Sequence, residues 1–265
     1  MTIRNAAVAG TFYPSDEGEL YADVNRMLNA TTFPKQADVA TYHPKALILP
    51  HAGYIYSGSV AAKGYRLLEG VKNSINRVVI LGPSHSVAFR GIALPRSDYF
   101  STPLGQIAVD QQAYEQLHSI SCVFQSDEAH LHEHSLEVHL PFLQVQLNRF
   151  KLIPLVVGDA TASEVADVIR TYIDLDDVLI IVSTDLSHFL DYKQAQQTDR
   201  QTSELICDKF TEIKGHQACG SRPLNGILKL AKEQDLQVEE LAVCNSGDTA
   251  GDKSRVVGYG AYVVY

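Results

Sequence analysis

The stretch LILPHAGYIYSG, residues 47–58, joins an apolar strand to an abrupt polar ending. Its unbroken apolar start is typical of a strand covered on both faces, and His51 follows directly after Pro50. Three later stretches repeat this arrangement, and they deliver in turn Ser84 and His85, then Ser183, Asp185 and His188, and finally Asn245, Ser246, Asp248 and Thr249. These strands indicate the fold class, and they place polar side chains where each strand ends.

Helical patterns alternate with the strands along the chain. We predict helices over about 16–29, 59–69, 192–209 and 223–234, and a further helix that begins at a capping box formed by Thr161 and Glu164. The predicted strands cover 45–50, 77–81, 151–157, 178–183, 238–244 and 254–264, and a polar connection spans 29–45. This alternation predicts one α/β domain over residues 1–265, with a mostly parallel central sheet and helices on both faces.

Composition narrows the classes of partner. The 265 residues carry a net charge of -9 and contain no run of five Lys or Arg, which argues against nucleic acid and anionic membranes. A small molecule or a peptide is the expected ligand. We predict a cytoplasmic protein, because no apolar run reaches membrane-spanning length and the amino-terminal residues do not resemble a signal peptide. Four separated cysteines suit reduced thiols.

The strand ends predict a metal site. Ligands of open α/β sheets bind beyond the carboxyl ends of the parallel strands, where His51 and His85 are expected. Two histidines and one carboxylate are typical of non-haem iron sites, so we predict Fe(II) held by His51, His85 and Asp248, with zinc or copper as alternatives. His188 would be the acid or base and Asp185 would orient it.

Four further residues need separate comment. Ser84 and Thr249 adjoin predicted ligands, so we expect both to line the pocket. Asp248 has a competing role, because aspartate in a glycine-rich turn often caps the loop through backbone amides. Cys219 does not follow a strand, and this makes a thiol nucleophile the weaker hypothesis.

The stretch DEAHLHEHSLEVHLPFLQ allows two interpretations. His130, Glu133 and His134 match the His-x-x-Glu-His pattern of zinc peptidases, which predicts a zinc hydrolase if one helix carries all three. Pro141 would kink such a helix. If the helix instead begins near His134, then His134, Glu137 and His139 would line the pocket around the metal ligands.

Several motifs together resemble the Memo family, known in prokaryotes as AmmeMemoRadiSam system protein B. They are AGTFYP, LPHAGYIYSG, LGPSH, EHSLEVHLPFLQ, STDLSHF, CGSRP and VGYGAYVV, and they run in order from about Ala9 to Val264. The resemblance implies a fold similar to class III extradiol ring-cleaving dioxygenases. It also implies that His51 and His85 are metal ligands, that His188 is the acid–base residue and that His139 is an additional pocket histidine.

The resemblance leaves the activity open. This chain departs from the family pattern at the third metal ligand. The resemblance therefore does not itself supply Asp248, which we predict only as a substitute ligand. We therefore expect an iron-dependent, dioxygenase-like oxidoreductase of unknown substrate, and we keep a non-enzymatic peptide- or protein-binding module as the alternative. The family also implies an Ammecr-type partner and a radical-SAM partner.

Overall fold

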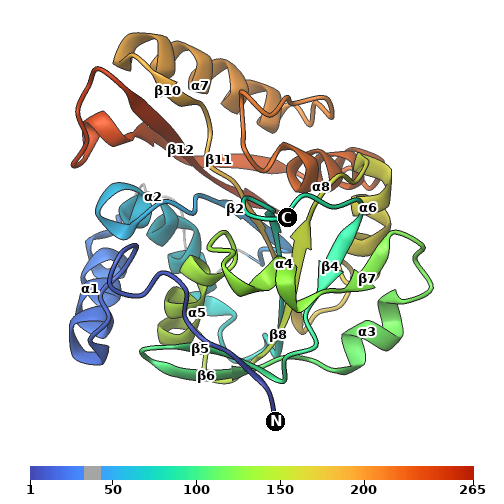
Figure 1. Cartoon of the computed structure of the whole chain (residues 1–265). Coiled ribbons are helices and arrows are strands. Elements are labelled where there is room, and N and C mark those ends of the chain that lie inside the picture. Colours follow the sequence, from blue (N-terminus) through green and yellow to red (C-terminus); the bar gives the residue numbers. More distant parts are fainter. Residues whose placement is uncertain (33–42) are drawn as a thin grey trace.

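The computed structural model describes residues 1–32 and 43–265. Most of the predicted polar connection, residues 33–42, lies outside the described residues. Figure 1 shows the chain, with the carboxyl-terminal strands β11 and β12 packed beside helix α7 at the top of the view.

Four parallel strands form the centre of the main sheet. In spatial order they are β2 (Ala46–Leu49), β9 (Val178–Ser183), β3 (Arg77–Pro83) and β8 (Lys151–Val157). Nearly all their side chains are buried and apolar, as expected for strands covered on both faces. Because the strands are parallel, the loops after β2, β3 and β9 leave from the same edge of the sheet.

Strands of mixed direction extend the sheet on both sides. On one side β12 (Val256–Val264) runs antiparallel to β2, and it pairs in turn with β11 (Val238–Asn245) and β10 (His188–Leu190). On the other side β4 (Ile92–Leu94) runs antiparallel to β8 and parallel to β7 (Val123–Gln125). The α/β class is confirmed, and nine of the twelve strands in the described residues form a mixed sheet whose centre is parallel.

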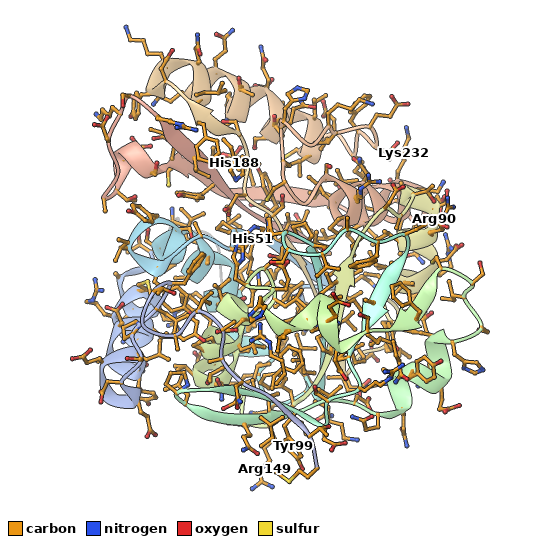
Figure 2. All side chains as sticks on the ribbon, in the orientation of Figure 1. His51, Arg90, Tyr99, Arg149, His188 and Lys232 are labelled. Carbon is orange, nitrogen blue, oxygen red and sulfur yellow. The ribbon has the colours of Figure 1, made fainter. Side chains whose placement is uncertain are left out.

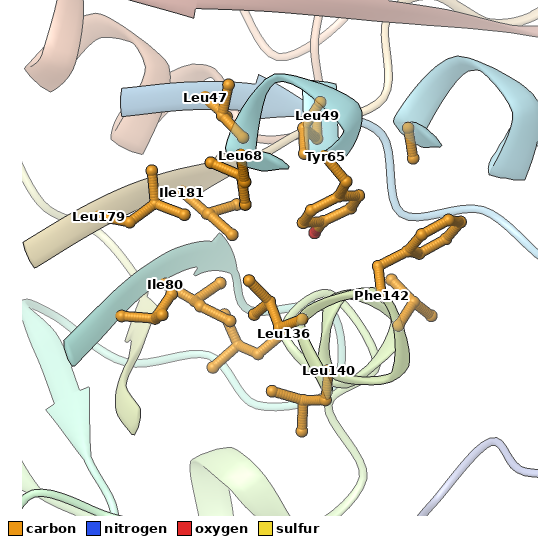
Figure 3. Close-up of a cluster of buried hydrophobic side chains, with 14 of the residues drawn as sticks. Leu47, Leu49, Tyr65, Leu68, Ile80, Leu136, Leu140, Phe142, Leu179 and Ile181 are labelled. Carbon is orange, nitrogen blue, oxygen red and sulfur yellow. The ribbon is translucent and has the colours of Figure 1, made fainter. Parts of the chain in front are cut away.

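Side chains of each central strand alternate between two cores. Leu47 and Leu49 point into the core beneath α1 (Glu17–Ala30), α2 (Tyr54–Arg66) and α5 (Leu140–Gln146), part of which is shown in Figure 3. Ala46 and Ile48 point into the other core, beneath α6 (Ala162–Arg170) and α8 (Ser221–Glu233). Helices therefore cover both faces, and functional residues at the sheet edge stand on a rigid base.

The remaining elements are short or peripheral. A second sheet joins β1 (Ile3–Arg4), β5 (Tyr99–Thr102) and β6 (Gly105–Ala108). The other helices are α3 (Gln112–Leu117), α4 (Asp127–Leu131) and α7 (Tyr192–Cys207), and the 3-10 turns are η2 (Leu67–Gly70), η3 (Glu137–His139) and η4 (Ser246–Asp248). Within the described ranges no helix combines the length and apolar character needed to cross a bilayer.

The observed start of one helix differs from the start predicted from the sequence. Thr161 and Glu164 form the predicted capping box of α6. By contrast, α2 begins at Tyr54, five residues before the predicted start at 59, and the carbonyl of Phe12 accepts the hydrogen bond of the Tyr54 amide. A contact from the distant amino-terminal segment thus satisfies the exposed end of this helix, which local sequence patterns do not reveal.

Candidate metal centre

Three histidines meet at the edge of the central sheet. His51 follows β2, His85 follows β3, and His134 lies in the turn between α4 and η3. One ring nitrogen from each lies within 4.8 Å of the other two, and no further group of this kind occurs among the described residues. The ring centroids are 5.2 Å apart for His51 and His85, 5.5 Å for His51 and His134, and 4.5 Å for His85 and His134. Three converging imidazoles are suitable ligands for a divalent transition metal.

Buried His51 is held by groups from distant strands and helices. Its Nδ1 lies 2.7 Å from Ser183 Oγ at the end of β9. Ser183 Oγ also lies 2.9 Å from His139 Nε2, and Tyr65 Oη lies 2.7 Å from His139 Nδ1. His139 is fully buried, which lowers its pKa to about 3 and keeps it neutral. The predicted pocket histidine therefore lies behind His51 and contacts it through Ser183.

Asp185 and Cys219 flank the other side of His51. Asp185 Oδ1 accepts the His51 amide at 2.8 Å, and its Oδ2 lies 3.9 Å from His51 Nε2. Burial raises the pKa of Asp185 to about 7, so a nearby cation would promote its ionisation. Cys219 Sγ lies 3.3 Å from His51 Nε2, and burial raises its pKa to about 12. The Asp185 carboxylate and the Cys219 thiolate are therefore additional potential metal ligands within reach of the cluster.

His188 lines a pocket beside the cluster. Its Nδ1 donates to the carbonyl of Leu186 at 2.9 Å, which leaves Nε2 with the lone pair. Burial is the main cause that lowers the pKa of His188, so the ring is neutral at physiological pH. Figure 2 shows His51 near the middle of the molecule and His188 nearer to the C-terminal strands.

The pocket has a volume of about 430 Å³. His134, Asp185 and His188 line it, together with the aromatic rings of Phe12, Tyr56 and Tyr259 and the side chain of Arg255. The ring of Phe12 packs on that of His134, with centroids 4.8 Å apart. The pocket is thus large enough for a small molecule, and it reaches the cluster at His134.

The structure places Asp248 apart from the histidine cluster. Tyr192 Oη donates a hydrogen bond to Asp248 Oδ1, and the Asn245 amide donates to Oδ2 at 3.0 Å. Asp248 thus caps η4, and Thr249 donates to the carbonyl of Ser246 in the same turn. This corrects the predicted ligand set, because hydrogen bonds within the C-terminal loop hold the carboxylate and His134 takes the third place in the cluster.

The structure separates the three residues of the zinc-hydrolase motif. Helix α4 ends at Leu131, so His130 and His134 do not share a helical face. His130 Nε2 instead bonds the Ala93 carbonyl at 2.9 Å. Glu133 Oε2 accepts the His85 amide at 2.6 Å, and its Oε1 lies 2.8 Å from His85 Nδ1. The motif therefore contributes His134 and a carboxylate that orients His85, and His130 is outside the cluster.

Two further residues predicted around the pocket have other contacts. Glu137 is buried and accepts hydrogen bonds from Arg4, from Tyr13 Oη at 2.5 Å and from the amides of Ala7 and Val8. It therefore anchors the amino-terminal segment that carries Phe12 to the pocket. Ser84 Oγ donates to the Val87 carbonyl at 2.6 Å and stabilises the loop after β3.

Sequence reasoning missed the roles of Glu133, Ser183 and Cys219. Cys219 is 168 residues from His51 in the chain, and Ser183 is 132 residues from it. The one available signal was that Ser183 ends a core strand, where the parallel register pairs it with Leu49, the last residue of β2 and two residues before His51. For Cys219 no local pattern indicates the contact.

Comparisons with known proteins agree with this architecture. The model of the Memo family, described as Memo-like protein, matches residues 4–263. A MEMO1 family protein of Sulfurisphaera tokodaii is 35% identical, with 97% of each chain covered, and one of Aquifex aeolicus is 34% identical, with 98% of each covered. The crystal structure of an uncharacterized protein from Escherichia coli K12 superposes with a TM-score of 0.52 at 10% identity, over 83% of this chain and 99% of that one. At this identity the last similarity shows the fold alone.

Proposed function

Since the chain belongs to the Memo family, we propose that it binds one divalent metal ion, Fe(II), through His51, His85 and His134 and oxidises a small molecule held in the adjacent pocket. The observation that carries this proposal is the convergence of three ring nitrogens beside a pocket of about 430 Å³. Zinc and copper are the alternative ions, because imidazole binds all three metals.

The donor chemistry fits a divalent cation. Glu133 accepts a hydrogen bond from His85 Nδ1, which leaves Nε2 free as a ligand, and this carboxylate–histidine pair is common around protein metals. The three rings carry no negative charge, but Asp185 and Cys219 lie beside His51 and would supply it on ionisation. A cation within reach of both groups favours their charged forms.

The chain's own residues would bind and deprotonate the substrate. Phe12, Tyr56 and Tyr259 offer apolar walls, and Arg255 offers a positive charge. His188 lines the same pocket, and its Nε2, which carries the lone pair, would accept a proton from a bound hydroxyl group. Bound iron would supply the redox chemistry with dioxygen, for which protein side chains have no equivalent. The choice of reaction class rests on the fold that the Memo resemblance implies, which is similar to that of class III extradiol dioxygenases.

Metal analysis of protein purified without oxygen tests the proposal. Wild-type protein should retain about one iron per chain after Fe(II) loading and desalting, and a His51→Ala, His85→Ala double variant should retain less than a tenth of that. The matched control is His118→Ala, because His118 is an exposed histidine on the surface next to α3. Equal iron in the double variant and the control would reject the site.

Oxygen consumption separates oxidation from recognition. With iron bound, wild-type protein should consume dioxygen in the presence of a substrate found by screening small phenols and acids, and His188→Gln should slow this at least tenfold with little change in bound iron. If iron binds and no screened compound supports oxygen uptake, the non-enzymatic peptide-binding function gains support. Co-purification from the native host would check the Ammecr-type and radical-SAM partners.

A further inference from the structure

Ser183 Oγ is the meeting point of three buried groups. It lies 2.6 Å from the Ser135 carbonyl oxygen, 2.7 Å from His51 Nδ1 and 2.9 Å from His139 Nε2. All four residues are at most 2% exposed. Since a hydroxyl donates one hydrogen bond and accepts two, these contacts use its full capacity.

The chemistry of the partners determines where each proton lies. A carbonyl oxygen can only accept, so the Ser183 hydroxyl must donate to Ser135. The other two contacts then require donors, which places a hydrogen on His51 Nδ1 and another on His139 Nε2. The neutral His139 ring consequently has its lone pair on Nδ1, and Tyr65 must donate to it. Burial raises the pKa of Tyr65 well above its usual value and keeps its hydroxyl protonated.

We infer that Ser183, His139 and Tyr65 are positioning residues that hold His51 in the Nδ1–H form and so present its Nε2 lone pair to the metal centre. This inference rests on the proposed metal site. It gives His139, predicted from sequence as an additional pocket histidine, a role that acts through Ser183. His85, the other histidine at a strand end, also carries its hydrogen on Nδ1, because there the Glu133 carboxylate accepts the Nδ1–H.

The reverse form of His51 would be costly in this surrounding. With the hydrogen on Nε2, the bare Nδ1 would face a hydroxyl oxygen whose only hydrogen is already used by Ser135. Turning the hydroxyl toward His51 would leave the Ser135 carbonyl without that bond. Unpaired polar groups in a buried site cost about 1–3 kcal/mol each, so the network selects one form of the ligand.

Nitrogen-15 NMR of the metal-free wild-type protein tests the inference without any activity. Long-range proton–nitrogen correlations distinguish the two ring nitrogens of each histidine. We expect His51 to carry its hydrogen on Nδ1 and His139 to carry its hydrogen on Nε2, at neutral pH. The opposite form in either ring would overturn the inference.

Serine substitutions link the network to metal binding. In Ser183→Ala both rings lose their acceptor, so the Fe(II) dissociation constant should rise about 10- to 100-fold, as is usual when a partner of a metal ligand is removed. Ser57→Ala is the matched control, because Ser57 is equally buried and its hydroxyl donates to the Ala52 carbonyl outside this network. Equal affinity in the two variants would overturn the inference.

Tyrosine substitutions test the far end of the network. Tyr65→Phe removes the donor to His139 and keeps the ring that stacks on Phe142, so Fe(II) affinity should fall less than in Ser183→Ala. Tyr54→Phe is its control, since it removes a buried hydroxyl that bonds the Val138 carbonyl in the same core. A larger loss of affinity in Tyr54→Phe than in Tyr65→Phe would contradict the network. If wild-type protein binds no iron, the proposed function fails, whereas the NMR result still decides the proton positions.

Discussion

Glu133 holds His85 at two points. Its carboxylate accepts the backbone amide of His85 at 2.6 Å and lies 2.8 Å from the ring Nδ1. Burial alone would raise the pKa of this carboxyl, but the hydrogen bonds and charge interaction with His85 outweigh it and lower the pKa to about 2. Glu133 is therefore ionised at neutral pH, and it fixes both the position and the hydrogen of a metal-ligating ring.

Glu133→Gln should weaken Fe(II) binding about 10- to 100-fold. The two carboxylate oxygens accept from three N–H groups, those of His85 and the Ser135 amide. A glutamine has one oxygen, so its amino group would face at least one donor. Calorimetric titration of the metal-free variant with Fe(II) under nitrogen gives the dissociation constant. Unchanged affinity would show that Glu133 does not orient the ligand.

His130→Gln and His134→Gln should differ in bound metal. His134 belongs to the cluster, so its loss should lower Fe(II) affinity more than tenfold, while His130→Gln should change affinity less than threefold because its ring bonds Ala93. Equilibrium dialysis followed by elemental analysis measures both. Metal lost only in the His130 variant would restore the zinc-hydrolase hypothesis.

Asp248→Ala should lower stability without changing metal binding. The variant loses the bonds from Tyr192 and the Asn245 amide that close η4, a loss of about 1 kcal/mol in the free energy of unfolding, as for other capping residues. Urea denaturation of the metal-free protein measures this, and dialysis against Fe(II) measures the affinity. A tenfold loss of affinity with unchanged stability would return Asp248 to the ligand set.

The Asp199→Asn variant should become more stable relative to the wild-type protein as pH rises. Asp199 is buried on α7, and burial raises its pKa from 3.8 to about 6, so the folded state binds more protons than the unfolded state between these values. Wild-type stability from this group therefore falls as pH increases through that window and stays reduced above it. Asparagine has no charge to bury and can still accept from the Ser187 amide at the Oδ1 position.

The measurement for Asp199 is urea denaturation at pH 4 and pH 8. The unfolding free energy of the variant relative to wild type should increase between the two by on the order of 1–3 kcal/mol. The same difference at both pH values would mean that Asp199 titrates normally in the folded protein.

Local sequence patterns determined the fold class and two of the three clustered histidines. Unbroken apolar runs, such as those ending at Leu49 and Ser183, indicate strands buried on both faces. Successive side chains point to opposite faces of the sheet, so all of them are apolar only where both faces are covered. The positions of His51 and His85 followed from the same runs, since the carboxyl ends of neighbouring parallel strands lie at one edge. These inferences needed only neighbours in the chain and the geometry of a parallel sheet.

Only the tertiary structure decided which loops meet at that edge. It brought Cys219 to His51 across 168 residues and Glu133 to His85 across 48, and it turned Asp248 toward Tyr192. It also divided the His-x-x-Glu-His motif by ending α4 at Leu131. Such contacts depend on the packing of distant segments and on which buried polar groups must be satisfied, and neither quantity has a period or spacing that a single sequence displays.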